Sequence, residues 1–149
     1  NGTPDVEDPM SHPECFYCEP DQRQADLMVK VGDLSVSDLF VFKEQTYAGR
    51  CLVAYRGHVN ELFELADAER DAFCKDVADA ARAMKLAFRP AKINYGAYSD
   101  KLGHLHLHLV PKYVDGPDYG STFRMMPEPR VLLSDADYEA LAARIRAAL

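Results

Sequence analysis

The feature that most constrains this chain is the stretch Gly103–Pro111, in which histidine alternates with leucine. Three of the five histidines of the chain, His104, His106 and His108, occupy alternate positions here. A strict period of two is typical of a β-strand with two different faces. We therefore expect a strand over Leu105–Lys112, with the leucines in the core and a row of imidazoles on the opposite face. Because a strand does not need histidine for its own stability, the row indicates chemistry rather than packing.

The spacing of the row limits that chemistry. On a strand, neighbouring histidines of the row are roughly 7 Å apart and the outer two roughly 13 Å apart. An adjacent pair could share one metal ion, but all three on a straight strand could not. Either two of them bind a metal, or one does while the others face a substrate. The alternative is three solvated histidines on an open sheet face.

Size and charge exclude several classes of protein. A chain of 149 residues suits one domain with a real core. The net charge of −7 argues against a general nucleic-acid binder, since phosphate contacts need a basic surface. No apolar run reaches transmembrane length and no signal-peptide pattern is present, so we expect no membrane partner and a cytoplasmic location.

The predicted elements give an α+β pattern. Residues 1–13 are predicted to be a disordered tail, with Met10 as a candidate natural start and residues 1–9 as an addition from cloning, and residues 14–149 to form the domain. Besides the histidine strand, the sequence predicts strands at Leu27–Val31, Leu39–Glu44, Cys51–Tyr55 and Lys92–Tyr98. It also predicts a helix with Asp67 as its N-cap that runs to Phe88 along an apolar stripe, and a second helix after a Ser134 cap. The strand Lys92–Tyr98 and the histidine strand should form an antiparallel hairpin, with helices covering one side of the sheet.

Two of the four cysteines have metal-binding spacing. Cys15 and Cys18 supply two thiolates from one tight turn, which is half of a tetrahedral zinc site. His58 and one histidine of the row are the candidates for the other half. Four protein ligands leave no open position, so such a zinc would be structural; the alternative is a chance pair of free thiols. Cys51 and Cys74 are predicted to be buried thiols.

With one histidine of the row bound to metal, the other two would face a cavity. A neutral imidazole is a good nucleophile toward phosphorus, and its cationic form binds a phosphate oxygen. Asn94 on the neighbouring strand, with Ser99 and Lys101 in the connecting turn, could supply donors to a phosphate. Lys101 would stabilise a leaving group there, although a lysine in a turn can also be merely solvated.

These residues resemble the histidine triad (HIT) family. The stretch from His104 to Pro111 matches the family pattern of three histidines separated by apolar residues, and Cys51–Val59 is similar to the strand that precedes it. The resemblance implies a five-stranded antiparallel sheet with helices, usually in a homodimer. It also implies nucleotide binding and cleavage at the α-phosphate through a nucleotidyl-histidine intermediate.

The resemblance assigns roles to individual residues. The middle histidine of the family is the nucleophile, which implies His106, and the last histidine and an Asn contact the phosphate, which implies His108 and Asn94. Some bacterial members and the related hexose-phosphate uridylyltransferases bind zinc through a C-x-x-C pair, a later histidine and the first histidine of the triad. On this chain that set is Cys15, Cys18, His58 and His104.

The chain also departs from the family. Many members have a Gly-His pair before the third strand, where this chain has Gly49-Arg50; an arginine could bind phosphate but does not release its proton. Lys101 stands where a Ser or Thr is common. Glu44 is the nearest candidate for the acid that binds ribose, and Ser99 is a further candidate for substrate binding.

The sequence thus predicts a HIT-type nucleotide hydrolase with a structural zinc. An adenine dinucleoside polyphosphate is the first candidate substrate and a nucleoside phosphoramidate the second, both with an AMP moiety. One alternative is a nucleotidyltransferase or phosphorylase, in which phosphate rather than water takes the nucleotidyl group. Others are a non-catalytic nucleotide-binding module and, less favoured, an open catalytic zinc on the triad.

Overall fold

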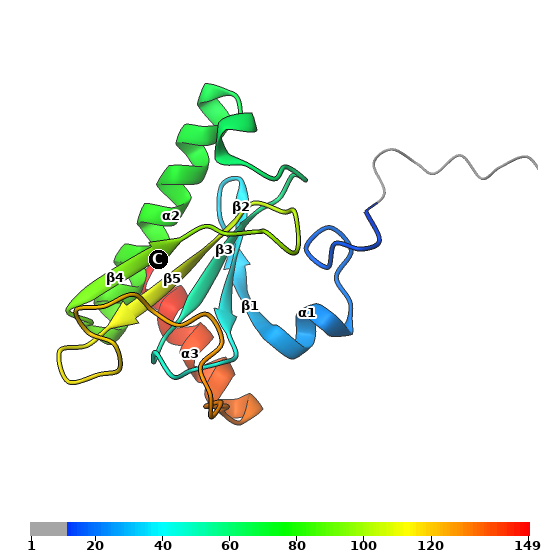
Figure 1. Cartoon of the computed structure of the whole chain (residues 1–149). Coiled ribbons are helices and arrows are strands. Elements are labelled where there is room, and N and C mark those ends of the chain that lie inside the picture. The colour runs from blue at the N-terminus through cyan, green and yellow to red at the C-terminus, as the bar shows by residue number, and fades with distance from the viewer. Residues whose placement is uncertain (1–11) are drawn as a thin grey trace, which may run out of the picture.

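The structure, a computed structural model, describes residues 12–149, and a five-stranded antiparallel sheet runs through their centre (Figure 1). The strands are β1 Met28–Asp33, β2 Ser37–Phe42, β3 Cys51–Tyr55, β4 Lys92–Gly96 and β5 His106–Lys112. The helices are α1 Gln22–Leu27, α2 Asp67–Phe88 and α3 Asp135–Ala148, with a 3-10 turn η1 at Leu62–Glu64. The predicted α+β class with a five-stranded antiparallel sheet is confirmed.

The strand order β1-β2-β3-β5-β4 places the histidine strand inside the sheet. β5 pairs with β4 in the predicted antiparallel arrangement and with β3 on its other side. In the second pairing, His106 lies opposite Ala54 and His108 opposite Leu52. Because α2 and β4 are inserted between β3 and β5 in the chain, this pairing is a long-range contact that joins the two halves of the fold.

The two faces of the sheet differ as the alternation predicts. Leu105 and Leu109 are buried on the face that α2 and α3 cover, and Leu107 packs against the same cluster (Figure 1). The opposite face carries His106 and His108 among a second apolar cluster, whose buried members are Met28, Phe40, Phe42, Leu52 and Ala54. The imidazoles therefore lie in a largely apolar environment.

Helix α2 has the predicted bounds but differs in two details. Its N-cap is Ala66, with no capping side chain, so the prediction that Asp67 is the cap is wrong; Asp67 is the first helical residue. Cys74 is exposed, which corrects the prediction of a buried thiol. The reason is helical geometry, because Cys74 lies outside the buried stripe that includes Phe73 and Val77.

The structure describes the C-terminal end of the chain but not residues 1–11. The predicted tail falls almost wholly on residues 1–11, which lie outside the described residues. At the other end, the Ser134 side chain accepts a hydrogen bond from the Asp137 backbone N–H at 3.2 Å, so the predicted cap of α3 is confirmed. Within residues 12–149, no helix combines the length and the hydropathy that crossing a bilayer requires.

Asp76 attaches α2 to the turn between β1 and β2. One carboxylate oxygen accepts from the backbone N–H and the hydroxyl of Ser35, and the other from the Val36 N–H and the Ser37 hydroxyl, at 2.6–3.1 Å. Burial alone would raise the pKa of this carboxyl, but the four hydrogen bonds together lower it below its usual value. The charged form of Asp76 therefore stabilises the packing of α2 on the sheet.

We expect Asp76→Asn to lower the free energy of unfolding by about 2–3 kcal/mol at neutral pH, because the amide NH2 must face a backbone N–H. Since the folded pKa is below the unfolded value, the contribution is complete above the unfolded pKa and is lost as pH falls through the folded pKa. Urea unfolding at several pH values measures this. Asp79→Asn on the same helix, whose carboxylate makes surface ion pairs, is the control and should change little; equal losses in both variants would contradict the assignment.

Candidate active site and metal site

The side chain of His106 is held with one ring nitrogen turned inward. Its Nδ1 lies 2.7 Å from the backbone oxygen of His104 and 3.3 Å from the Ser99 hydroxyl, which itself donates to the same oxygen at 3.0 Å. A carbonyl oxygen only accepts, so Nδ1 carries the proton and Nε2 has a free lone pair. Burial lowers the pKa of His106, which favours this neutral form. His106 is therefore oriented as a nucleophile or base through Nε2.

The side chain of His108 meets a buried arginine. Nη2 of Arg50 lies 3.0 Å from Nδ1 of His108. Burial, with Arg50 beside it, lowers the pKa of His108 to about 3. Arg50 also donates to the backbone oxygen of Met125 at 2.9 Å, and its guanidinium lies 4.3 Å from the centre of the Phe42 ring. The residue that replaces the fourth family histidine is thus in direct contact with the triad.

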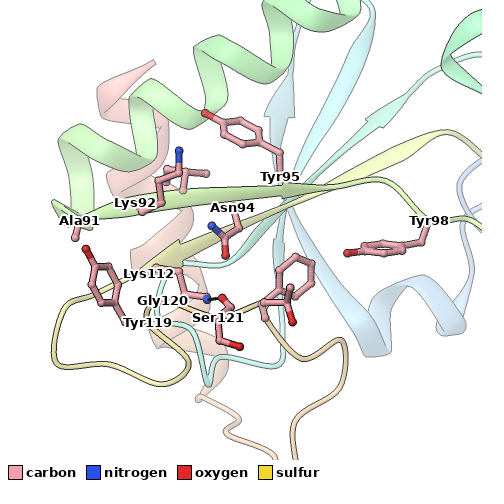
Figure 2. Close-up of a pocket in the computed structure, with 12 residues that line it drawn as sticks. Ala91, Lys92, Asn94, Tyr95, Tyr98, Lys112, Tyr119, Gly120 and Ser121 are labelled. Atoms are coloured by element: carbon pink, nitrogen blue, oxygen red, sulfur yellow. Dashed lines mark hydrogen bonds between the residues drawn. The ribbon is translucent and has the colours of Figure 1, made fainter.

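A pocket of about 750 Å³ opens between β4 and the segment after β5 (Figure 2). Asn94 of β4 contributes to its lining, because its side chain lies on the same sheet face as those of His108 and Lys112. The other walls come from residues 91–95 at β4, from Tyr98 and Lys112, and from residues 119–123 after β5; no histidine of the row lines the pocket. The ring of Phe123 in that segment lies 6.3 Å from the ring of His108. A ligand held at the row could therefore extend into this pocket.

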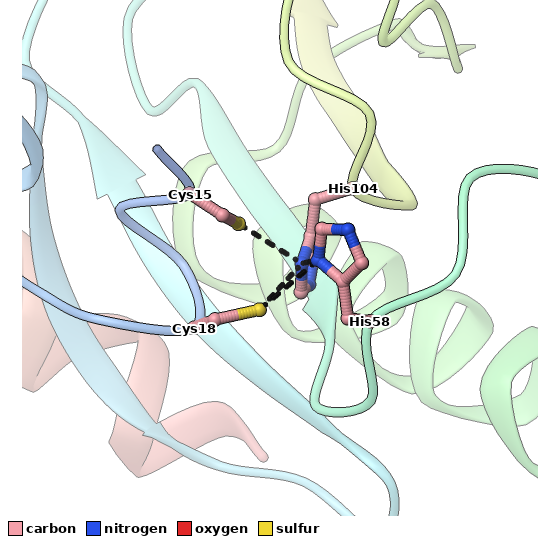
Figure 3. A group of neighbouring side chains, drawn as sticks. All are labelled: Cys15, Cys18, His58 and His104. Carbon is pink, nitrogen blue, oxygen red and sulfur yellow. Dashed lines mark hydrogen bonds between the residues drawn. The ribbon is translucent and has the colours of Figure 1, made fainter. Parts of the chain in front are cut away.

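The structure brings Cys15, Cys18, His58 and His104 together, although they come from distant parts of the chain (Figure 3). One ligand atom from each lies within 4.8 Å of all the others. The sulfurs of Cys15 and Cys18 lie 3.3 and 3.4 Å from Nδ1 of His104, and Cys18 lies 3.1 Å from Nδ1 of His58. In a tetrahedral zinc site with normal bond lengths, such ligand atoms are about 3.3–3.6 Å apart. The four residues could hold a zinc ion.

The surroundings of the four side chains also suit a cation. Burial and the neighbouring Cys15 raise the pKa of the Cys18 thiol to about 12, so without a metal the thiolate form is disfavoured. A bound cation would stabilise two thiolates side by side. His104 directs Nδ1 at the sulfurs, while its Nε2 donates to the Tyr55 backbone oxygen at 2.6 Å. A bond of this kind fixes the tautomer and the ring orientation of a metal ligand.

Of the remaining predicted residues, Glu44 and Lys101 lie apart from these contacts. Glu44 is buried, and its carboxylate accepts hydrogen bonds from Thr46 and from the backbone N–H of Val131. Both oxygens are therefore engaged in holding the chain after β2 to residue 131. Lys101 is exposed in the turn between β4 and β5 and, within residues 12–149, forms no hydrogen bond or ion pair.

Sequence reasoning missed the contribution of Tyr17. It lies between the two cysteines, and its ring centre is 5.0 Å from that of His104 and 5.1 Å from that of His106. The candidate metal loop therefore also covers the histidine row. An aromatic residue inside a C-x-x-C pair was the available signal, but it does not say which surface the ring contacts.

Comparison with known proteins decides the family. Residues 28–115, more than half of the chain, match the HIT domain family. The chain belongs to the HIT family.

Individual relatives agree with this assignment. Protein hit of Bacillus subtilis is 27% identical over 90 residues, which are 57% of this chain and 62% of that protein, so the chain spans about three-fifths of this relative. The structure of a HIT protein from Sinorhizobium meliloti has a TM-score of 0.78 at 19% identity, covering 87% of this chain and 95% of that one. A zinc-bound HIT family protein from Mycobacterium smegmatis has a TM-score of 0.63 at 17% identity, covering 90% and 91%. The two structures share the fold of this chain.

We expect the purified HIT protein to bind about one equivalent of zinc. Cys15→Ser should remove the zinc and lower the melting temperature, because two thiolates and two imidazoles from separate segments would no longer be joined. Elemental analysis and thermal unfolding measure both effects. Cys74→Ser, the same substitution at an exposed helix position, is the control and should keep its zinc; equal zinc content in the two variants would exclude this site.

Proposed function

We propose that this HIT protein is a nucleotide hydrolase that cleaves at the α-phosphate through a nucleotidyl group on His106. The observation that supports the proposal is the bond from His106 Nδ1 to the His104 carbonyl, which leaves Nε2 free on the sheet face. His104 is engaged in the metal cluster, so the nucleophile would be a metal-free imidazole. An adenine dinucleoside polyphosphate is the preferred substrate, with a nucleoside phosphoramidate second.

The proposed reaction has two displacements. His106 Nε2 attacks the α-phosphorus, and the bond from phosphorus to the leaving group breaks, with its electron pair leaving on that group. Water then attacks the phosphorus, the bond to Nε2 breaks, and AMP is released after the water proton passes to solvent. The imidazole returns to its starting tautomer because its proton stays on Nδ1, hydrogen-bonded to the His104 carbonyl, throughout.

Other side chains would bind the phosphates, and a zinc ion would stabilise the fold. Asn94 and His108 would donate to phosphate oxygens, and Ser99 would do so once its hydroxyl turns from the His104 carbonyl. Arg50 would add buried positive charge, and Lys101 would approach the leaving group from the turn. Zinc bound by Cys15, Cys18, His58 and His104 would be structural, since four protein ligands leave no position for substrate. We further propose a homodimer that acts in the cytoplasm.

We expect His106→Ala to lose at least about a thousandfold in kcat with diadenosine tetraphosphate while still binding AMP, because only the nucleophile is removed. Rapid quenching of the wild type followed by mass spectrometry should locate a nucleotidyl group on His106. Cys74→Ala, at an exposed position of α2, is the control and should remain active.

The products separate the candidate functions. Release of AMP in both the presence and absence of phosphate supports hydrolysis, whereas formation of ADP with phosphate would indicate transfer instead. Unchanged nucleotide binding with no turnover by the wild type would indicate a binding module and exclude the proposal.

A further inference from the structure

Arg50 is a fully buried cation that forms no ion pair with a carboxylate within the described part of the chain, although the charge of Glu44 favours its protonated form. Its guanidinium lies between the rings of Phe42 and Phe123, at 4.3 and 5.3 Å from their centres. No ion pair among residues 12–149 includes it, and its buried Nε has no hydrogen-bond partner. Burying a charge without a paired carboxylate costs free energy, so the presence of Arg50 at this place indicates a function for it.

The contact between Arg50 and His108 defines where the proton of His108 lies. A guanidinium has only donors, so Nδ1 of His108, 3.0 Å from Nη2, must accept through its lone pair. The single proton of the neutral ring is therefore on Nε2. A second proton on Nδ1 would face an N–H donor and place two positive charges side by side. Arg50 opposes the cationic form of His108 through both effects.

The two imidazoles of the row that remain outside the metal cluster are thus held in opposite tautomers. His106 keeps its proton on Nδ1, bonded to the His104 carbonyl at 2.7 Å, and presents a lone pair at Nε2. His108 presents an N–H at Nε2. Their ring centres are 5.4 Å apart on the same sheet face, so one substrate phosphate could meet both.

We propose that Arg50 is a positioning residue that holds His108 as a neutral hydrogen-bond donor and so restricts the reaction to substrates whose leaving group needs no proton. The inference rests on the function proposed above and narrows its substrate class. It favours phosphoric anhydrides, such as dinucleoside polyphosphates, over phosphoramidates with a P–N bond.

The chemistry of the leaving group gives the reason. When His106 Nε2 bonds to phosphorus, a departing phosphate anion holds the electron pair of the broken P–O bond without taking up a proton. A departing amine must be protonated as the P–N bond breaks. A cationic histidine could supply that proton, but His108 has only the N–H of a neutral ring, whose loss would create an imidazolate. The N–H of His108 can therefore stabilise charge on the phosphate but cannot protonate an amine.

The test uses a series of adenosine 5′-(aryl phosphate) esters whose leaving phenols differ in pKa. For the wild type, kcat/KM should fall steeply as the pKa of the phenol rises, because neutral His108 supplies no proton to it and Lys101 would contribute its charge rather than a proton. Arg50→His should flatten this dependence and raise kcat/KM for adenosine 5′-phosphoramidate, relative to diadenosine tetraphosphate, by about tenfold or more. Arg50→Lys, which keeps a cationic donor, should retain the steep dependence.

The matched control is Arg144→His. Arg144 also stacks on an aromatic ring, at 4.9 Å from the centre of Phe88, but lies on the helix side of the sheet. This control should leave the dependence on phenol pKa unchanged. A shallow dependence in the wild type, or one that Arg50→His does not alter in a folded protein, would overturn the inference.

A second measurement does not depend on turnover or on how well the variants fold. Two-bond 1H–15N correlation spectra of the wild-type histidine rings should show His108 protonated at Nε2 and His106 at Nδ1. A proton on Nδ1 of His108 would overturn the inference even if the enzyme is active. If the spectra agree but the wild type releases no AMP from any of these esters, the proposed function fails instead.

Discussion

His104 is the residue on which both parts of the site depend. Its Nδ1 lies close to the sulfurs of both Cys15 and Cys18, and its Nε2 donates a hydrogen bond to the Tyr55 carbonyl. Its own backbone oxygen accepts the hydrogen bond that sets the tautomer of His106. A metal ion that fixes the ring of His104 would also fix the strand end that orients His106, the proposed nucleophile. A metal with no open position can in this way contribute to catalysis without contacting substrate.

The segment after β5 completes the environment of the other end of the row. Met125 accepts a hydrogen bond from Arg50 through its backbone, and the Phe123 ring packs against the guanidinium. Tyr47, which lies near the start of β3, accepts from the Arg124 backbone N–H and donates to Asp118. These contacts help to enclose Arg50, which is fully buried and, among residues 12–149, is in no ion pair. The apolar surroundings strengthen its electrostatic effect on His108 and on any bound phosphate.

Most of the architecture could be predicted from local patterns, and the exceptions have specific causes. The alternation of His and Leu predicted the faces of β5, and the apolar stripe predicted α2 from Asp67 to Phe88, because periodicity follows directly from backbone geometry. The cap of α2 was mispredicted because an acidic residue suits the first turn as well as the cap. The exposure of Cys74 depends on whether it lies within the buried face of the helix, and its residue type alone does not show this.

The candidate site divides in the same way. By itself the sequence determined the row of imidazoles, the paired thiols and the presence of an arginine at position 50, because residue identity and short spacing are local properties. Which histidine joins the thiols was indicated by family resemblance, and the meeting of four side chains from three segments is a property of the fold. Only the tertiary structure decided that Glu44 bonds to Val131, that Tyr17 covers the row and that Arg50 contacts His108. The physical reason is that these contacts join residues from separate segments, several of them distant in the chain, whose meeting depends on strand order and register rather than on local sequence.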